Sequence, residues 1–168
     1  TITYRDDPFF IDPRNKKLGA RGIVNLEKLY LSIKKLELKL EDSKNYYELS
    51  YNLGIAQINT KNLQEKIFGL ECNFEELNGI DFKKGCYVGQ ENTARMKLKN
   101  KVRKKLFAIK SNDKLKIGSD INFNSIKIGQ IVIDEPYPFG LIKIVDPDFS
   151  EYKDKDLLIN DSKSKIIQ

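Results

Sequence analysis

The chain has 168 residues, 40% apolar and 32% charged, a balance typical of a protein that buries a core in one domain or two small ones. Its longest apolar runs are far too short to cross a bilayer as a helix, and no charged-then-apolar leader opens it, so we expect neither a membrane span nor a secretion signal. The absence of histidine and the presence of only two cysteines exclude Cys-His and Ser-His nucleophile pairs, a disulfide framework and a four-cysteine iron–sulfur site held by this chain alone.

The first part of the chain predicts short strands and turns followed by a helix. Residues 1–26 combine extended runs with turn formers at Asp12-Pro13-Arg14 and at Gly19. From about 25 to 40, apolar residues recur at the spacing of one helix face. They are Leu29, Ile33, Leu36 and Leu40. The end of this run also alternates with period two, which leaves open where the helix ends.

Two more helices are predicted before residue 100. Asp42 or Ser43 can cap the first of them, and Gly54 can end it. Residues 55–82 predict short irregular pieces, and residues 88–98 predict the other helix. The chain begins with Thr1 and contains a single methionine, so we expect a further segment of the same protein upstream.

Beyond residue 100 the pattern changes to short β runs separated by glycine and proline. These runs are 103–110, 114–123, 126–134, 139–145 and 156–167. Five or six short strands in so few residues indicate a small closed antiparallel barrel. The prediction is therefore an α+β protein with two domains, residues 1–100 and a β-barrel over residues 101–168.

The formal charge of +6 is concentrated in one window. Residues 83–105 contain nine lysines or arginines and one acid, which gives +8 and leaves about −2 for the rest of the chain. Such a patch suits an anionic partner such as a phosphate, a polyglutamate tail or RNA. The alternative is an ordinary solvated surface. No aromatic residue interrupts the run from Arg95 to Lys105, which argues against a stacking platform for single strands.

The segment Lys84-Gly85-Cys86-Tyr87-Val88-Gly89-Gln90-Glu91 concentrates the most chemistry in the chain. Its thiol stands between a lysine pair and the expected start of a helix, and positive potential from both favours the thiolate. Tyr87 can pack under the turn, while Gln90 and Glu91 can cap free amides or touch a ligand. The alternative is a small buried cysteine. Cys72 has no basic neighbour, and we interpret it as a packing residue.

A second candidate combines turn formers with two arginines, in Asp12-Pro13-Arg14 and Leu18-Gly19-Ala20-Arg21. It is either a hairpin with exposed arginines or a site where the guanidinium groups reach a carboxylate or phosphate. No Walker or dinucleotide-type glycine loop exists, so nucleotide hydrolysis has no support.

The 84–91 segment resembles the signature of the folate-binding YgfZ family, relatives of the glycine-cleavage T-protein that include mitochondrial iron–sulfur assembly factors. The segments on either side of it also resemble those of the family and come in the same order, from the two-arginine segment to the turn before the signature. The other matching elements are Leu53-Gly54-Ile55, Asn78-Gly79-Ile80, Ala94-Arg95 and Gly140-Leu141-Ile142. The resemblance spans nearly all of this chain but only the later part of a complete family member.

The resemblance implies a T-protein-like body around a tetrahydrofolate site, followed by a six-stranded barrel. It implies a factor that assists assembly or repair of iron–sulfur proteins, including radical enzymes that modify tRNA, rather than a turnover enzyme. Carried over by position, the functional residues are Cys86 and Lys84. The candidate folate contacts are Arg14, Arg21, Tyr87, Gln90 and Glu91, and no metal ligands are assigned. Cys86 would receive a one-carbon adduct or help to bridge a cluster to a client protein.

Two other functions stay open at this point. One is a folate-dependent aminomethyltransferase of the T-protein type, although that protein lacks the cysteine signature and its catalytic aspartate would lie upstream. The other is an RNA- or tRNA-binding module that uses Arg95–Lys105. The reduced thiols fit a bacterial cytoplasm, which lysine-rich usage favours, or a mitochondrial matrix.

Overall fold

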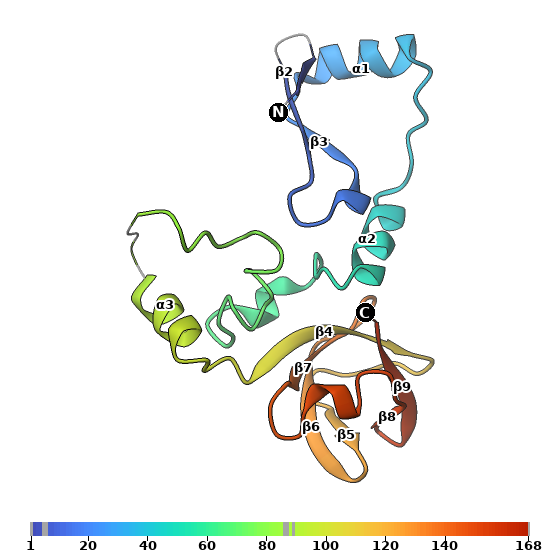
Figure 1. Cartoon of the computed structure of the whole chain (residues 1–168). Helices are drawn as coiled ribbons and strands as arrows, with labels where there is room; N and C mark the ends of the chain where they lie inside the picture. Colours follow the sequence, from blue (N-terminus) through green and yellow to red (C-terminus); the bar gives the residue numbers. More distant parts are fainter. Residues whose placement is uncertain (1, 5–6, 86–87, 89, 168) are drawn as a thin grey trace.

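The computed structural model describes residues 2–4, 7–85, 88 and 90–167. It shows a mixed α+β chain in three successive parts: a small sheet with a helix, an irregular middle segment, and a closed barrel (Figure 1). The predicted fold class and the predicted barrel are confirmed at this level. None of the helices in the described part of the chain is long and apolar enough to cross a membrane.

The first part is a three-stranded antiparallel sheet followed by a helix. The sheet has the order β1-β2-β3, with the strands β1 (Ile2–Tyr4), β2 (Asp7–Ile11) and β3 (Ala20–Gly22). Helix α1 (Leu26–Lys35) starts at Asn25, whose side chain accepts hydrogen bonds from two backbone amides of the first turn.

Helix α1 ends five residues before the limit that its apolar spacing predicted. The amide of Leu38 donates to the carbonyl of Ile33, and Glu37 has a φ of 51°, in the left-handed region. This is a helix-terminating geometry, and a residue in that conformation cannot continue the helix. Leu36 is therefore the C-cap of α1 and Leu40 lies beyond the helix, which answers the question of where it ends.

The capping predictions for the next helix are confirmed. Helix α2 (Ser43–Asn52) begins after Asp42, whose carboxylate accepts a 2.8 Å hydrogen bond from the amide of Lys44. It ends before Gly54, which has a φ of 70°. A residue with a Cβ rarely adopts that conformation, which explains the glycine stop. Helix α3 (Gln90–Leu98) follows the irregular middle segment and corresponds to the predicted third helix.

Six strands close the barrel, in the order β4-β7-β6-β5-β8-β9. They are β4 (Lys104–Ser111), β5 (Asp120–Phe123), β6 (Ile126–Ile133), β7 (Phe139–Lys143), β8 (Leu157–Ile159) and β9 (Ser162–Ile167). The predicted run 156–167 is two strands, because Asn160 and Asp161 form a turn with positive φ values of 49° and 65°.

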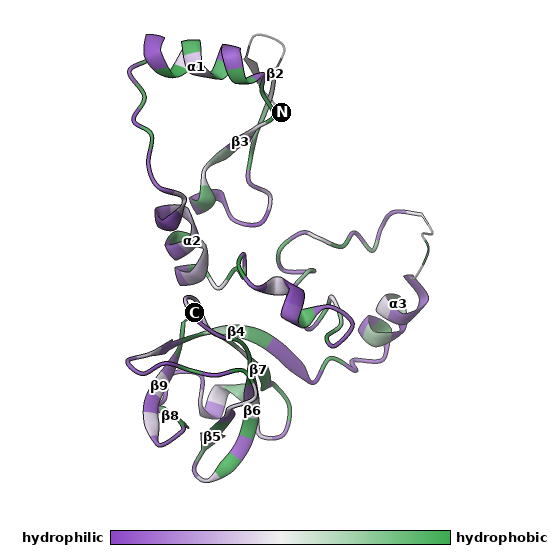
Figure 2. Cartoon of the chain, turned by 180° about the vertical axis from the view of Figure 1, so that it is seen from behind, coloured by the Kyte–Doolittle hydropathy of each residue, from purple (hydrophilic) through white to green (hydrophobic). Residues whose placement is uncertain are grey.

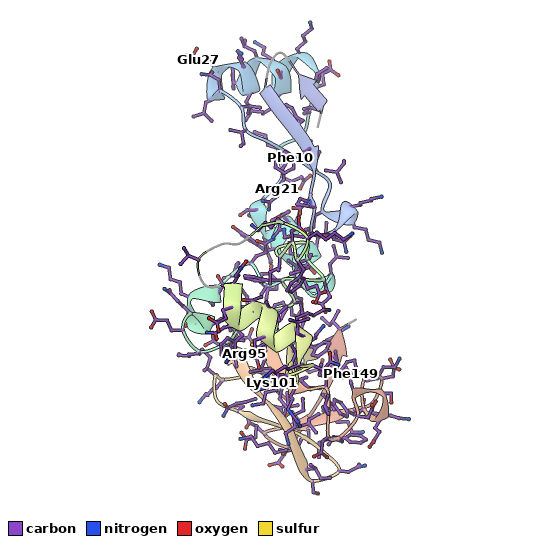
Figure 3. The ribbon with its side chains drawn as sticks, turned by 60° about the vertical axis from the view of Figure 1, so that its left-hand side comes forward. Phe10, Arg21, Glu27, Arg95, Lys101 and Phe149 are labelled. Carbon is purple, nitrogen blue, oxygen red and sulfur yellow. The ribbon has the colours of Figure 1, made fainter. Side chains whose placement is uncertain are left out.

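The barrel interior holds the main hydrophobic core. It is filled by branched aliphatic side chains from all its strands, and Ile121, Ile128 and Ile131 are fully buried. The rings of Phe107 and Phe149 stack beside this core with centroids 4.6 Å apart, and Figure 3 shows Phe149 at the barrel. At Gly140 a Cβ would meet the Cδ1 of Ile121, so a larger residue there would force that side chain to shift.

The irregular middle segment is attached to the outside of strand β4. A second apolar cluster joins Leu63 to Leu106 and Ala108 of that strand. The amide of Leu106 donates to the carbonyl of Glu71 at 2.8 Å, and its carbonyl accepts from the side chain of Asn73 at 2.6 Å. The barrel therefore provides the platform on which the residues around the signature segment are held.

Candidate functional site

The signature segment is described only at its flanks. Cys86 and Tyr87 lie outside the described residues, so their predicted roles stay predictions. Lys84 is exposed on the amino side. Gln90 opens α3, so the predicted helix over residues 88–98 begins within the signature, and Glu91 pairs with Arg95 one turn later at 3.1 Å. An acid in the first turn favours the helix dipole, which is the structural role predicted for Glu91.

An open groove of about 770 Å³ lies between the chain leading into the signature and helix α3. Apolar side chains form much of its lining, and charged groups stand among them. The lining residues are Glu75, Asn78, Ile80, Asp81, Phe82, Lys83, Ala94, Lys97 and Leu98. The formal charges of the lining balance, because Glu75 and Asp81 stand beside Lys83 and Lys97. A largely apolar groove of this size with a few polar groups suits a small-molecule ligand.

Lys97 connects the two walls of this groove. Its ammonium contacts both carboxylate oxygens of Glu75, at 2.7 and 2.8 Å, and lies 5.9 Å from the ring centre of Phe82. The first contact is an ion pair and the second a cation–π interaction. Together they link α3 to the segment that precedes the signature.

The two predicted arginines converge on a carboxylate of the protein itself. Arg14 approaches Asp12 through Nε (3.0 Å) and Nη2 (2.7 Å), and Arg21 Nε lies 2.7 Å from the same carboxylate. Both guanidinium groups also donate to the hydroxyl of Tyr46 at 2.8 Å, and the amide of Gln57 donates to it at 3.0 Å. Figure 3 shows Arg21 where the first sheet meets the rest of the chain.

This arrangement perturbs two ionisable groups. Hydrogen bonding from Arg14, with the charges of both arginines, lowers the pKa of Asp12 to about 2 although burial opposes the shift. Burial raises the pKa of Tyr46, but the two arginine hydrogen bonds outweigh it, and the net direction is down. Arg14 is largely committed to these contacts, whereas the side chain of Arg21 is 46% exposed and can still meet an external anion.

Asn78 joins this arginine cluster to the groove. Its side-chain amide donates to the carbonyl of Pro13 at 2.7 Å, and the same residue lines the groove. The turn that carries Arg14 and the segment that leads into the signature are thus in direct contact. The sequence predicted Asn78 only as part of a turn. It did not predict the contacts of Tyr46 and Gln57, because the residues they contact lie far away along the chain.

Cys72 is the other thiol, and it is half-buried among apolar residues. It packs against the cluster around Leu106 and lines a separate cavity of about 430 Å³. Burial raises the pKa of its thiol, which opposes thiolate formation. These observations agree with its interpretation as a packing residue. Among the residues that the structure describes, no group of three or more histidine, cysteine or acidic side chains could hold a metal ion.

The chain is similar to mitochondrial proteins named as iron–sulfur cluster assembly factors. It is 37% identical over 121 residues to the mitochondrial iron–sulfur cluster assembly factor IBA57 homologue of Dictyostelium discoideum, covering 64% of this chain and 29% of that protein. The IBA57 homologue of Neurospora crassa is 38% identical over 95 residues (56% and 21%), and that of Aspergillus oryzae is 45% identical over 56 residues (33% and 12%).

These matches cover less than a third of each relative's length. No protein-family model matches the chain. The relatives are named as mitochondrial, which accords with the mitochondrial alternative; a bacterial cytoplasm stays a prediction.

Proposed function

We propose that this chain is part of a folate-binding factor that assists the assembly or repair of iron–sulfur proteins, with Cys86 as its functional thiol. The observation that carries the proposal is the 37% identity over 121 residues to a protein named as an iron–sulfur cluster assembly factor. The residues add a second support, because the thiol lies between Lys84 and the start of α3, where positive potential favours the thiolate.

In this proposal the thiolate of Cys86 serves as a ligand for a cluster that is shared with a client protein. Two thiols in the chain cannot complete a cluster site, so the client or another partner supplies the remaining ligands. Cys72 is not part of the site, because it is packed against strand β4. The clients would include enzymes that modify tRNA. The compartment we propose is the mitochondrial matrix.

The groove beside α3 is the place we propose for tetrahydrofolate. Phe82 offers a ring face and Lys83 an ammonium group for the anionic tail, while Gln90 and Glu91 stand at the start of α3. When bound, folate would supply one-carbon chemistry. The chain supplies the binding surface and the thiol, within a T-protein-like body that further polypeptide completes.

The thiol is tested by complementation with the whole protein in cells that lack it, with the activity of an iron–sulfur enzyme as the readout. Cys86→Ala should abolish rescue, and Cys72→Ala should retain most of it. A silent Cys86→Ala change would overturn the role of the thiol.

The folate site is tested separately by titration of tetrahydrofolate. Phe82→Ala should weaken binding by about tenfold, because a ring face in the groove is lost. Phe68→Ala is the matched control, since Phe68 is exposed and does not line the groove. Equal affinities for the two variants would remove folate from this groove and leave the thiol proposal standing.

A further inference from the structure

The basic window around the signature is partly neutralised in the folded chain. Arg95 pairs with Glu91, Lys97 with Glu75, and Lys105 with Glu76. In the sequence, these three cations belong to the basic run from Arg95 to Lys105. Each of these three charges is balanced by an acid of the protein. These side chains are therefore poor candidates for binding an external anion.

The other cations of that run lie where the chain passes from α3 into the barrel. No ion pair joins Lys99, Lys101, Arg103 or Lys104 to any described acid, and all four side chains are exposed. Figure 3 shows Lys101 at the end of α3 nearest the barrel. The charge that remains free is therefore concentrated at the entry to strand β4.

The barrel adds a cation that the sequence could not assign to this place. Strands β4 and β7 pair antiparallel, and their register sets Lys104 directly opposite Lys143. Lys143 is half-buried and also forms no ion pair with a described acid. Opposed residues of an antiparallel pair lie on the same face with their Cβ atoms about 5 Å apart. The register thus places the bases of two lysine side chains next to each other on one face of the sheet.

Such a pair destabilises a sheet unless an anion lies between the charges. A second lysine pair in the same barrel shows the contrast. Lys110 faces Lys165 across β4 and β9, but Asp156 lies 3.4 Å from the ammonium of Lys165. The Lys104–Lys143 pair has no such carboxylate among the described residues, although the backbone there is firmly held by a 2.8 Å hydrogen bond from Ile144 to Arg103.

We propose that Lys101, Arg103, Lys104 and Lys143 form a binding surface for the phosphate backbone of a double-stranded nucleic acid, RNA in particular. Both residue types of this surface bind phosphate, arginine through its planar fork and lysine as a compact point charge. The lack of aromatic side chains in the run fits recognition of a duplex rather than stacking on single strands. This surface does not depend on the thiol or on folate.

The test is the salt dependence of binding of the whole protein to a 20-base-pair RNA duplex of mixed sequence. The double variant Lys104→Gln/Lys143→Gln should bind at least tenfold more weakly at low salt, and the slope of log K against log salt should fall by about 2. The matched control is Lys110→Gln/Lys165→Gln, which should change affinity less than twofold. Equal losses in both variants would overturn the proposal, as would tighter binding to a polyglutamate peptide than to RNA.

A second readout separates a binding role from a structural one. Because the opposed ammonium groups repel each other, Lys143→Gln alone should raise the melting temperature of the free protein by about 1–2 °C at low salt while it weakens RNA binding. A lower melting temperature together with weaker binding would show that Lys143 stabilises the fold, and the proposal would then be wrong.

Discussion

The barrel and the amino-terminal part of this chain differ in how fully they bury their apolar side chains. In the barrel, the side chains of Ile121, Ile128 and Ile131 are completely buried. In and after helix α1, Leu26 is 79%, Tyr30 69% and Leu40 75% exposed, and none of the residues of α1 is buried. Figure 2 shows hydrophobic and hydrophilic residues side by side on this helix. The barrel completes its own core, whereas α1 leaves Leu26 and Tyr30 largely exposed and only half-buries Leu29 and Ile33.

We propose that further polypeptide covers these exposed side chains. The relatives named above are longer than the regions they share with this chain, which amount to 29% and 21% of their lengths. An apolar helix face of this kind is normally buried by a neighbouring element. The barrel therefore buries its own core, whereas the amino-terminal part needs a further segment to cover its apolar residues.

The largest effect is expected from truncation in the barrel. Ile121→Ala should destabilise the chain by about 3–4 kcal/mol, because it leaves a cavity in a closed core. Leu26→Ala should cost less than about 0.5 kcal/mol in the 168-residue chain, since the side chain is already in solvent. Denaturant unfolding measures both. Equal costs would contradict the comparison, and a larger cost of Leu26→Ala in a longer protein would support the covering segment.

The next effect concerns the arginine cluster. Asp12→Asn should cost about 2–4 kcal/mol, because it leaves two guanidinium groups beside a neutral amide. Asp156→Asn is the control: it removes an exposed acid with two lysine partners and should cost less than about 1 kcal/mol. If both variants unfold at the same denaturant concentration, the cluster does not hold the first sheet to α2.

The same carboxylate predicts a pH dependence. Its pKa is lowered from 3.8 to about 2 in the folded protein, so the stabilisation is complete above about pH 4 and is lost as the pH falls toward 2. The shift corresponds to about 2 kcal/mol. The free energy of unfolding of the parent protein should fall more steeply over this window than that of Asp12→Asn. Parallel curves for the two proteins would show that Asp12 is not ion-paired in solution.

The smallest effect tests the joint between α2 and the barrel. The hydroxyl of Tyr51 donates to the carbonyl of Ile109 at 2.5 Å. Tyr51→Phe should cost about 1 kcal/mol, because one buried hydrogen bond is lost and the ring packing stays. Tyr30→Phe should be neutral, since its side chain lies on the exposed face of α1. A neutral Tyr51→Phe change would mean that apolar packing alone joins these parts.

The sequence predicted local structure well wherever local chemistry decides it. Asp42 and Gly54 set the ends of α2, and glycine- and proline-separated β runs predicted the barrel. Prediction from the sequence failed where the backbone conformation of one residue, or contacts between residues far apart in the chain, determine the structure. The apolar spacing continued to Leu40, but the left-handed Glu37 ends α1. The partners of Arg14 and Arg21 and the Lys104–Lys143 pair depend on strand register and tertiary packing, which periodicity does not encode.

In the proposed function, Cys86 is an activated thiol and Cys72 is not. The direct measurement is the pH dependence of alkylation of each cysteine by iodoacetamide in the whole protein, followed by mass spectrometry of the peptides. We expect Cys86 to titrate below the ordinary thiol pKa of about 8.5, and Cys72, whose thiol pKa burial raises, to react only at higher pH. A Cys86 thiol that titrates at or above the ordinary value would contradict this expectation.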